Sequence, residues 1–169
     1  MALKIEGGVP GYNNSYHFHA SPKYRMAVLN DSVAVRLEQL IAEKSEELGW
    51  KIHALAVDND HVHFLIESLD SPSQIAQRLF GYASFVLRKE FPALKEINAE
   101  HFWGGRQCKS VTDLQHFENT IAYINKHARM CALIIGCTGK ISAVTFYEKT
   151  RIKAAIKNFL GEPGIIRWK

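Results

Sequence analysis

The sequence has few cysteines and no long apolar run, and both absences exclude classes of protein. Its three cysteines are odd in number and form no C-x-x-C pair, so neither a disulfide framework nor a cysteine-rich zinc site is expected. The first residues lack the apolar core of a signal peptide, and no stretch approaches the ~20 apolar residues of a membrane span. We therefore expect a cytoplasmic protein whose thiols are small buried groups.

Internal repeats and low-complexity tracts are also missing, and 169 residues correspond to about one domain. The net charge of +4 is unevenly distributed, because from Lys140 onward seven basic residues stand against two acidic ones. Such a basic segment suits a polyanion such as nucleic acid, although an ordinary solvated face has the same composition. We assign residues 1–130 to the main domain and residues 131–169 to a basic C-terminal extension of it.

The expected strands and helices alternate along the chain. Asp58-Asn59-Asp60 separates two β-rich runs and indicates a hairpin, and Gly104-Gly105 predicts a break or bulge in the last strand. The order β-α-β-β-α-β-α predicts an α+β fold, a ferredoxin-like or RRM-like sandwich with an antiparallel sheet and helices on one face. The expected strands are 16–20, 50–57, 61–67 and 101–111, and the expected helices are 31–49, 71–90 and 113–128, with a further strand at 141–147 and a basic helix at 149–160.

His61 and His63 stand two residues apart in a predicted strand, so both imidazoles leave the same face. Two imidazoles at this spacing can share one metal ion. Two histidines in a half-buried strand are, however, more often structural or surface residues than ligands. Asp60 either accepts a hydrogen bond from one imidazole and orients it, or it is simply a turn residue. The pair is a weak signal on its own.

The last predicted helix places a tyrosine among polar groups on the face away from the core. At about 100° per residue, Tyr123 lies nearly opposite the core stripe, with His116, Asn119 and His127 close to it in angle. Tyr123 and His127 are four residues apart and therefore neighbours. Outward tyrosines are common on helices. Together with the histidine pair, however, this one could attack a phosphate polarised by metal and form a phosphotyrosine. The core stripe is Leu114, Phe117, Ile121, Ile124 and Ala128.

These residues give the chain a likeness to a known family. It resembles the HUH single-tyrosine transposases (TnpA type) of insertion sequences that move as single-stranded DNA. The motif His61-Val62-His63, the segment Lys23-Tyr24-Arg25 after the first strand, Phe102-Trp103, and Tyr123-Ile124 carry the likeness over roughly residues 14–130. The resemblance implies that His61 and His63 bind Mg²⁺ or Mn²⁺ and that Tyr123 is the nucleophile. Family members often carry glutamine as a third ligand one turn after the tyrosine, where this chain has His127.

The resemblance implies a transposase that excises and inserts an element through a 5′-phosphotyrosine intermediate, with residues 1–130 as its catalytic domain. It further implies a homodimer, in which each active site can take its histidine pair from one subunit and its tyrosine from the other. It also implies recognition of a DNA hairpin at the element ends and a mobile C-terminal helix that carries the tyrosine. This chain has no glycine directly before that helix, which departs from the family pattern. The expected DNA contacts are Lys23, Arg25, Arg106, Lys109, Lys126 and Arg129, with Tyr24 and Trp103 as aromatic residues able to stack on bases.

Other functions stay open at this point. A non-catalytic RRM-like nucleic-acid-binding module would use aromatic residues on the sheet face, but the aromatic-glycine motif of that family is absent. A domesticated HUH nickase would cut DNA without moving an element, and paired imperfect palindromes beside the gene would instead indicate a mobile copy. A hydrolase of small phosphoesters is a more distant alternative, because the basic tail would then have no purpose.

Overall fold

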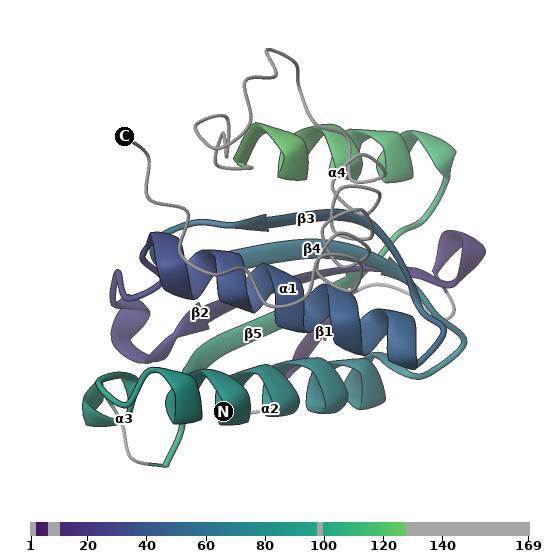
Figure 1. The fold of residues 1–169 in the computed structure, drawn as a ribbon. Helices are drawn as coiled ribbons and strands as arrows, with labels where there is room; N and C mark the ends of the chain where they lie inside the picture. Colours follow the sequence, from purple (N-terminus) through teal and green to yellow (C-terminus); the bar gives the residue numbers. More distant parts are fainter. Residues whose placement is uncertain (1–2, 7–10, 98–99, 128–169) are drawn as a thin grey trace, which may run out of the picture.

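The chain folds into a sheet with helices on both faces, and the computed structural model describes residues 3–6, 11–97 and 100–127 (Figure 1). Arg129, the extension 131–169 and its expected strand and helix lie outside the described residues. The elements are β1 (Lys4–Glu6), η1 (Tyr12–Asn14), β2 (Ser15–Pro22), η2 (Lys23–Arg25), α1 (Asp31–Glu47), β3 (Lys51–Val57), β4 (Val62–Glu67), α2 (Pro72–Glu90), α3 (Leu94–Ile97), β5 (Trp103–Ser110) and α4 (Leu114–His127).

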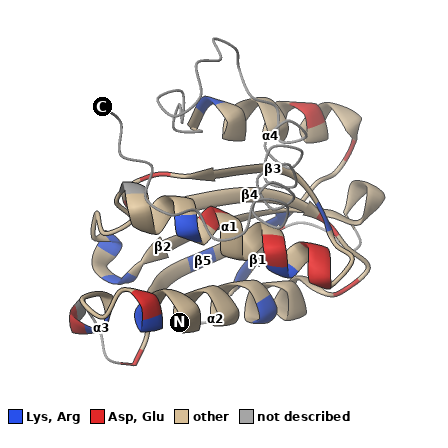
Figure 2. Ribbon diagram, in the orientation of Figure 1, with Lys and Arg blue, Asp and Glu red and all other residues tan. Residues whose placement is uncertain are grey.

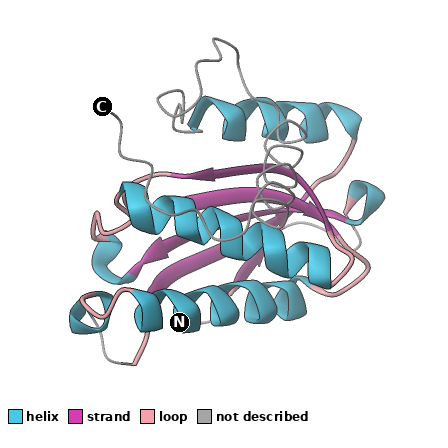
Figure 3. Ribbon diagram, in the orientation of Figure 1, coloured by secondary structure: helices cyan, strands magenta, loops and turns pink. Residues whose placement is uncertain are grey.

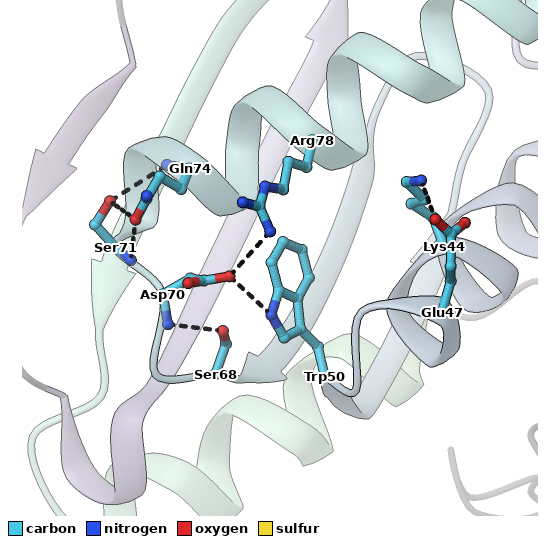
Figure 4. Close-up of polar contacts among 8 residues, drawn as sticks. All are labelled: Lys44, Glu47, Trp50, Ser68, Asp70, Ser71, Gln74 and Arg78. Atoms are coloured by element: carbon cyan, nitrogen blue, oxygen red, sulfur yellow. Dashed lines mark hydrogen bonds and ion pairs between the residues drawn. The ribbon is translucent and has the colours of Figure 1, made fainter.

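Local sequence signals account for where the helices begin and end. The Asn30 side chain accepts a hydrogen bond from the Val33 amide and caps α1, which ends shortly before Gly49 at a positive φ of 70°. Ser71 and Gln74 form a reciprocal capping box at the start of α2 (Figure 4). The helices predicted at 31–49, 71–90 and 113–128 and the β3–β4 hairpin are confirmed to within a few residues.

The sheet has the order β1-β5-β2-β4-β3. The strand β2 pairs antiparallel with both β4 and β5, and β3 pairs antiparallel with β4. Opposite β5, the register shifts between Ser21 and Pro22 so that Gly104 is skipped, which confirms the predicted bulge. The α+β class is confirmed, but the sheet is mixed, because the unpredicted strand β1 adds to β5 in parallel. With only three residues, β1 is too short to show a hydrophobic period.

The helices form two layers around the sheet (Figures 1 and 3). α1 and α2 cover one face over a large core that includes Phe18 and Phe64. α4 lies on the opposite face, where Ile124 packs against Ala54 and Leu65. The expectation of helices on one face therefore holds for α1 and α2, while the tyrosine-bearing helix covers the other. Strand alternation sends Phe64 toward α1 and α2 and sends His63 toward α4.

Three phenylalanines, two on the sheet and one on α2, form the centre of the core between the sheet and α1 and α2. The rings of Phe18 and Phe64 stack with centroids 5.1 Å apart, and Phe80 contacts both. We expect Phe18→Ala to lower the free energy of unfolding by about 3–5 kcal/mol, because it leaves a cavity in a fully buried site. Phe85→Ala on α2, where the ring is 67% exposed, should change it by less than about 0.5 kcal/mol. Urea unfolding of both variants measures the difference, and equal effects would contradict this packing.

None of the described helices is long and apolar enough to cross a membrane.

Candidate active site

Two histidine pairs meet on the sheet face that α4 covers. His17 and His19 lie on β2, while His63 lies on β4 and His61 immediately precedes that strand. Because His19 is directly opposite His63 in the antiparallel register, their side chains share a face. The ring centroids of His19 and His63 are 4.6 Å apart, and those of His61 and His63 are 4.9 Å apart. The two H-x-H pairs therefore form one cluster.

α4 adds the predicted tyrosine and a fifth imidazole to this histidine cluster. The Tyr123 ring centroid is 5.4 Å from that of His63 and 6.2 Å from that of His17. The His127 ring lies 6.0 Å from His61, and 4.7 Å from Tyr123 within the helix. Burial of Ile124 fixes the helix against the sheet, while Tyr123 remains 44% exposed. The structure thus brings together the four site residues predicted from the sequence, namely His61, His63, Tyr123 and His127.

A carboxylate that the sequence predicts only as part of a turn lies close to two of the histidines. Asp58, His61 and His127 each offer a ligand atom, and these atoms lie within 4.8 Å of one another. Two imidazoles and one carboxylate suit a divalent transition metal. His63 is not one of this trio, although its ring lies beside those of both histidines in it. Its Nδ1 instead lies 3.2 Å from Nε2 of His17, within hydrogen-bond distance.

Asp60 connects this trio to the turn η2. Its Oδ1 accepts a hydrogen bond from His61 Nδ1 at 2.5 Å, and its Oδ2 accepts one from Arg25 Nε at 2.8 Å. The hydrogen bond from His61 is the main cause that holds the pKa of the Asp60 carboxyl below its ordinary value, and Arg25 adds to it. The structure therefore agrees with the interpretation that Asp60 accepts a hydrogen bond from one imidazole and orients it.

Burial lowers the pKa of three histidines in the cluster, His17, His19 and His63. The pKa of His63 is lowered to about 3, first by burial and then by the charges of the neighbouring histidines. Burial also lowers the pKa of His17 to about 4, with His19 as the next cause. The pKa of His19 falls for the same first reason. These imidazoles are neutral at pH 7, and the neutral ring is the form that binds metal.

The start of α4 differs in part from the predicted pattern. His116 takes part in the N-terminal cap, since its amide donates to Asp113 and its Nδ1 accepts from the Thr112 amide. Leu114 was expected in the core stripe but is 53% exposed. It is the first residue of the helix, whereas the apolar contacts with the sheet begin at Phe117. Asn119 bonds along the helix to Gln115 rather than joining the histidine cluster.

The predicted DNA contacts fall on different parts of the structure. Lys109 is opposite His17 in the register and shares its face, where it pairs with Glu6 at 3.4 Å. Arg106 is opposite the core residue Ala20, which places its side chain on the face covered by α1 and α2. Lys126 is exposed in the last turn of α4. Lys and Arg therefore lie on both sides of the sheet in the described part of the chain (Figure 2).

The two aromatic residues predicted to stack on bases have different environments. Trp103 is buried in the core and donates its Nε1 hydrogen to the Phe80 carbonyl at 2.9 Å. Tyr24 is 74% exposed in η2, between Lys23 and Arg25. Tyr24 is therefore the one of the two whose ring an incoming base can reach.

Paired histidines on a sheet face, beneath a helix that carries a tyrosine, are the arrangement that the resemblance to single-tyrosine HUH transposases predicts. The sequence agrees, since the family of IS200-like transposases matches residues 11–127. The chain belongs to this family. No curated protein matches it in sequence.

Two solved structures share the fold. A candidate transposase from Deinococcus radiodurans R1 matches with a TM-score of 0.54 and 24% identity, over 73% of this chain and 97% of that one. A REP-associated tyrosine transposase bound to a REP hairpin matches with a TM-score of 0.50 and 15% identity, over 66% of this chain and 64% of that one. At these identities the likeness concerns the fold.

Proposed function

We propose that the protein cleaves and rejoins single-stranded DNA, with Tyr123 as the nucleophile and a divalent metal ion, Mg²⁺ or Mn²⁺, in the histidine cluster. The single observation that carries this proposal is the position of Tyr123, one helical turn from His127 and with its ring next to that of His63. A partly exposed tyrosine in this place can reach a phosphate held by the same cluster.

The donor set fits such a metal ion. Asp58, His61 and His127 converge. His63, which the family resemblance makes a ligand together with His61, lies beside them. His61 uses Nδ1 to bind Asp60, so its Nε2 carries the free lone pair. When bound, the ion polarises a non-bridging phosphate oxygen and offsets the charge that develops in the transition state.

The Tyr123 hydroxyl oxygen attacks phosphorus while the bond from phosphorus to the 3′ oxygen breaks. The phenolic proton is released, and the departing 3′ oxygen takes up a proton to become a free hydroxyl. The 5′ end of the DNA is then held as a phosphotyrosine. In the joining step a 3′ hydroxyl attacks this phosphotyrosine and restores both the phosphodiester and the tyrosine, so no nucleotide cofactor is consumed.

The DNA partner that we propose is a single strand with a hairpin near the element end. The structural relative described above is bound to a REP hairpin. In this chain Lys109 shares a sheet face with His17, and Lys126 is exposed in the last turn of α4. We also propose a homodimer. Among the described residues β3 is an edge strand of the sheet, and the backbone groups that they leave unpaired on this edge could pair with a second sheet.

Tyr24 is the residue that we expect to stack on an unpaired base. Tyr24→Ala should weaken binding of a single-stranded oligonucleotide by about 1–3 kcal/mol, the usual contribution of a base–aromatic contact. Fluorescence anisotropy without added metal measures this loss. Tyr24→Phe keeps the ring and should keep the affinity, so an equal loss in both variants would contradict stacking.

The proposed activity is tested on labelled single strands copied from the flanks of the gene, incubated with Mn²⁺ or Mg²⁺ and separated on a denaturing gel. We expect a slowly migrating covalent protein–DNA band that disappears when EDTA is present. Tight binding with no cleavage would favour the RRM-like binding module instead. Cleavage with an adduct but no strand joining would favour a domesticated nickase.

A further inference from the structure

The turn η2 has an unusual backbone that is held in place from the sheet. Tyr24 and Arg25 both have positive φ, at 59° and 51°. For residues other than glycine, such conformations cost about 1–3 kcal/mol each and persist where the surroundings enforce them. The Lys23 amide donates to the Phe102 carbonyl at 2.8 Å. Gly104 lies so close that a Cβ there would be 2.9 Å from the Lys23 Cα.

The backbone conformation of η2 places the Arg25 side chain in contact with Asp60. Arg25 Nε donates to Asp60 Oδ2 at 2.8 Å, and the other oxygen of the same carboxylate bonds His61 Nδ1. An ionised carboxylate can only accept hydrogen bonds, so the hydrogen of His61 is on Nδ1. The contact selects one tautomer and fixes the plane of the ring, with Nε2 available to a ligand.

We propose that Arg25 and Asp60 are positioning residues for the metal centre: Arg25 holds Asp60, and Asp60 holds His61 in the orientation that binds the ion. This inference rests on the proposed function, because it takes His61 to be a ligand. It gives Arg25 a role other than the direct DNA contact predicted from the sequence. It also explains why a strained turn is maintained beside the histidine cluster.

The test is metal binding in the absence of DNA, so that no contact with DNA can contribute. Mn²⁺ affinity is measured by calorimetry, and the visible spectrum of bound Co²⁺ reports the ligand geometry. We expect Asp60→Ala to weaken Mn²⁺ binding about 10- to 100-fold, as loss of an outer hydrogen-bond partner of a ligating histidine does, and to change the Co²⁺ spectrum. Arg25→Ala should act in the same direction with a smaller effect, because Asp60 keeps its bond to His61.

Conservative and control variants separate positioning from general destabilisation. Asp60→Asn keeps an oxygen that accepts from His61 Nδ1, so it should recover part of the affinity that Asp60→Ala loses. Arg78→Ala removes another Arg–Asp ion pair, the 3.4 Å contact with Asp70 beside Trp50 (Figure 4), and should bind Mn²⁺ as the wild type does. Circular dichroism checks that each variant is folded.

Wild-type affinity and an unchanged Co²⁺ spectrum in both Asp60→Ala and Arg25→Ala would overturn the positioning role, while leaving the proposed function intact. Equal losses in Asp60→Ala and Asp60→Asn would also contradict it, because the retained acceptor would then have no effect. A wild type that binds neither ion would refute the metal site of the proposed function, and the inference would fall with it.

Discussion

Tyr123→Phe should abolish the covalent protein–DNA adduct while the protein still folds and still binds DNA. The substitution removes one oxygen atom from a ring that is 44% exposed, so the free energy of unfolding should change by less than about 0.5 kcal/mol. The same oxygen is the proposed nucleophile. Its loss should therefore lower the rate of adduct formation by at least about 10⁴-fold, comparable with the loss of a nucleophile in other covalent enzymes.

The measurement is a time course of adduct formation on a denaturing gel, with DNA affinity measured separately by anisotropy. Tyr82→Phe is the matched control. Tyr82 lies on α2 and packs against the core on the opposite face of the sheet from the histidine cluster, so this variant should form the adduct at the wild-type rate. Adduct formation by Tyr123→Phe would show that another residue is the nucleophile.

His61→Ala is expected to have the second-largest effect. His61 belongs to the trio with Asp58 and His127 and is also the ring that Asp60 orients. Its loss should weaken Mn²⁺ binding more than about 100-fold. Loss of an outer hydrogen-bond partner of a metal ligand has at most about that effect. Cleavage should then fall to the level seen for the wild type in EDTA.

Calorimetry with Mn²⁺ and the gel assay together test this prediction. His53→Ala is a suitable control, because His53 lies on the neighbouring strand β3 but bonds Glu67 and contacts Phe117 instead of the cluster. It should bind Mn²⁺ with wild-type affinity. Adding excess metal should restore cleavage after EDTA in the wild type but not in His61→Ala. Unchanged cleavage by His61→Ala would contradict a metal role for this residue.

Much of the fold follows from local signals in the sequence. Pro72 and the Ser71 cap position α2, and the turn at Asp58–Asp60 sets the β3–β4 hairpin. The spacing of Tyr123 and His127 correctly predicts that they are neighbours on α4. These features depend on residues close together in the chain, where backbone geometry and side-chain period are sufficient. The rings of Tyr123 and His127 lie beside histidines of the sheet, however, and not on the face away from it as the helical period predicts.

Features that depend on strand pairing were harder to predict. The register between β2 and β4 brings His17 and His19 next to His61 and His63. The hydrophobic period within each strand does not reveal this register. A second H-x-H pair on an aromatic-rich strand was the available signal. Asp58 was interpreted only as part of a turn, although it precedes the motif by three residues. The face on which Arg106 lies likewise follows only from its register, since it is opposite Ala20 on the sheet face covered by α1 and α2.

The most direct test of the proposed mechanism is to locate the covalent bond. The adduct is digested with nuclease and trypsin, and the modified peptide is sequenced by mass spectrometry. Cleavage after Lys109 and Lys126 yields peptide 110–126, in which Tyr123 is the only tyrosine. We predict that this peptide carries a nucleotide joined through a 5′-phosphate to the Tyr123 oxygen. A nucleotide on any other residue, or cleaved DNA with no modified peptide, would contradict the assignment of Tyr123 as nucleophile.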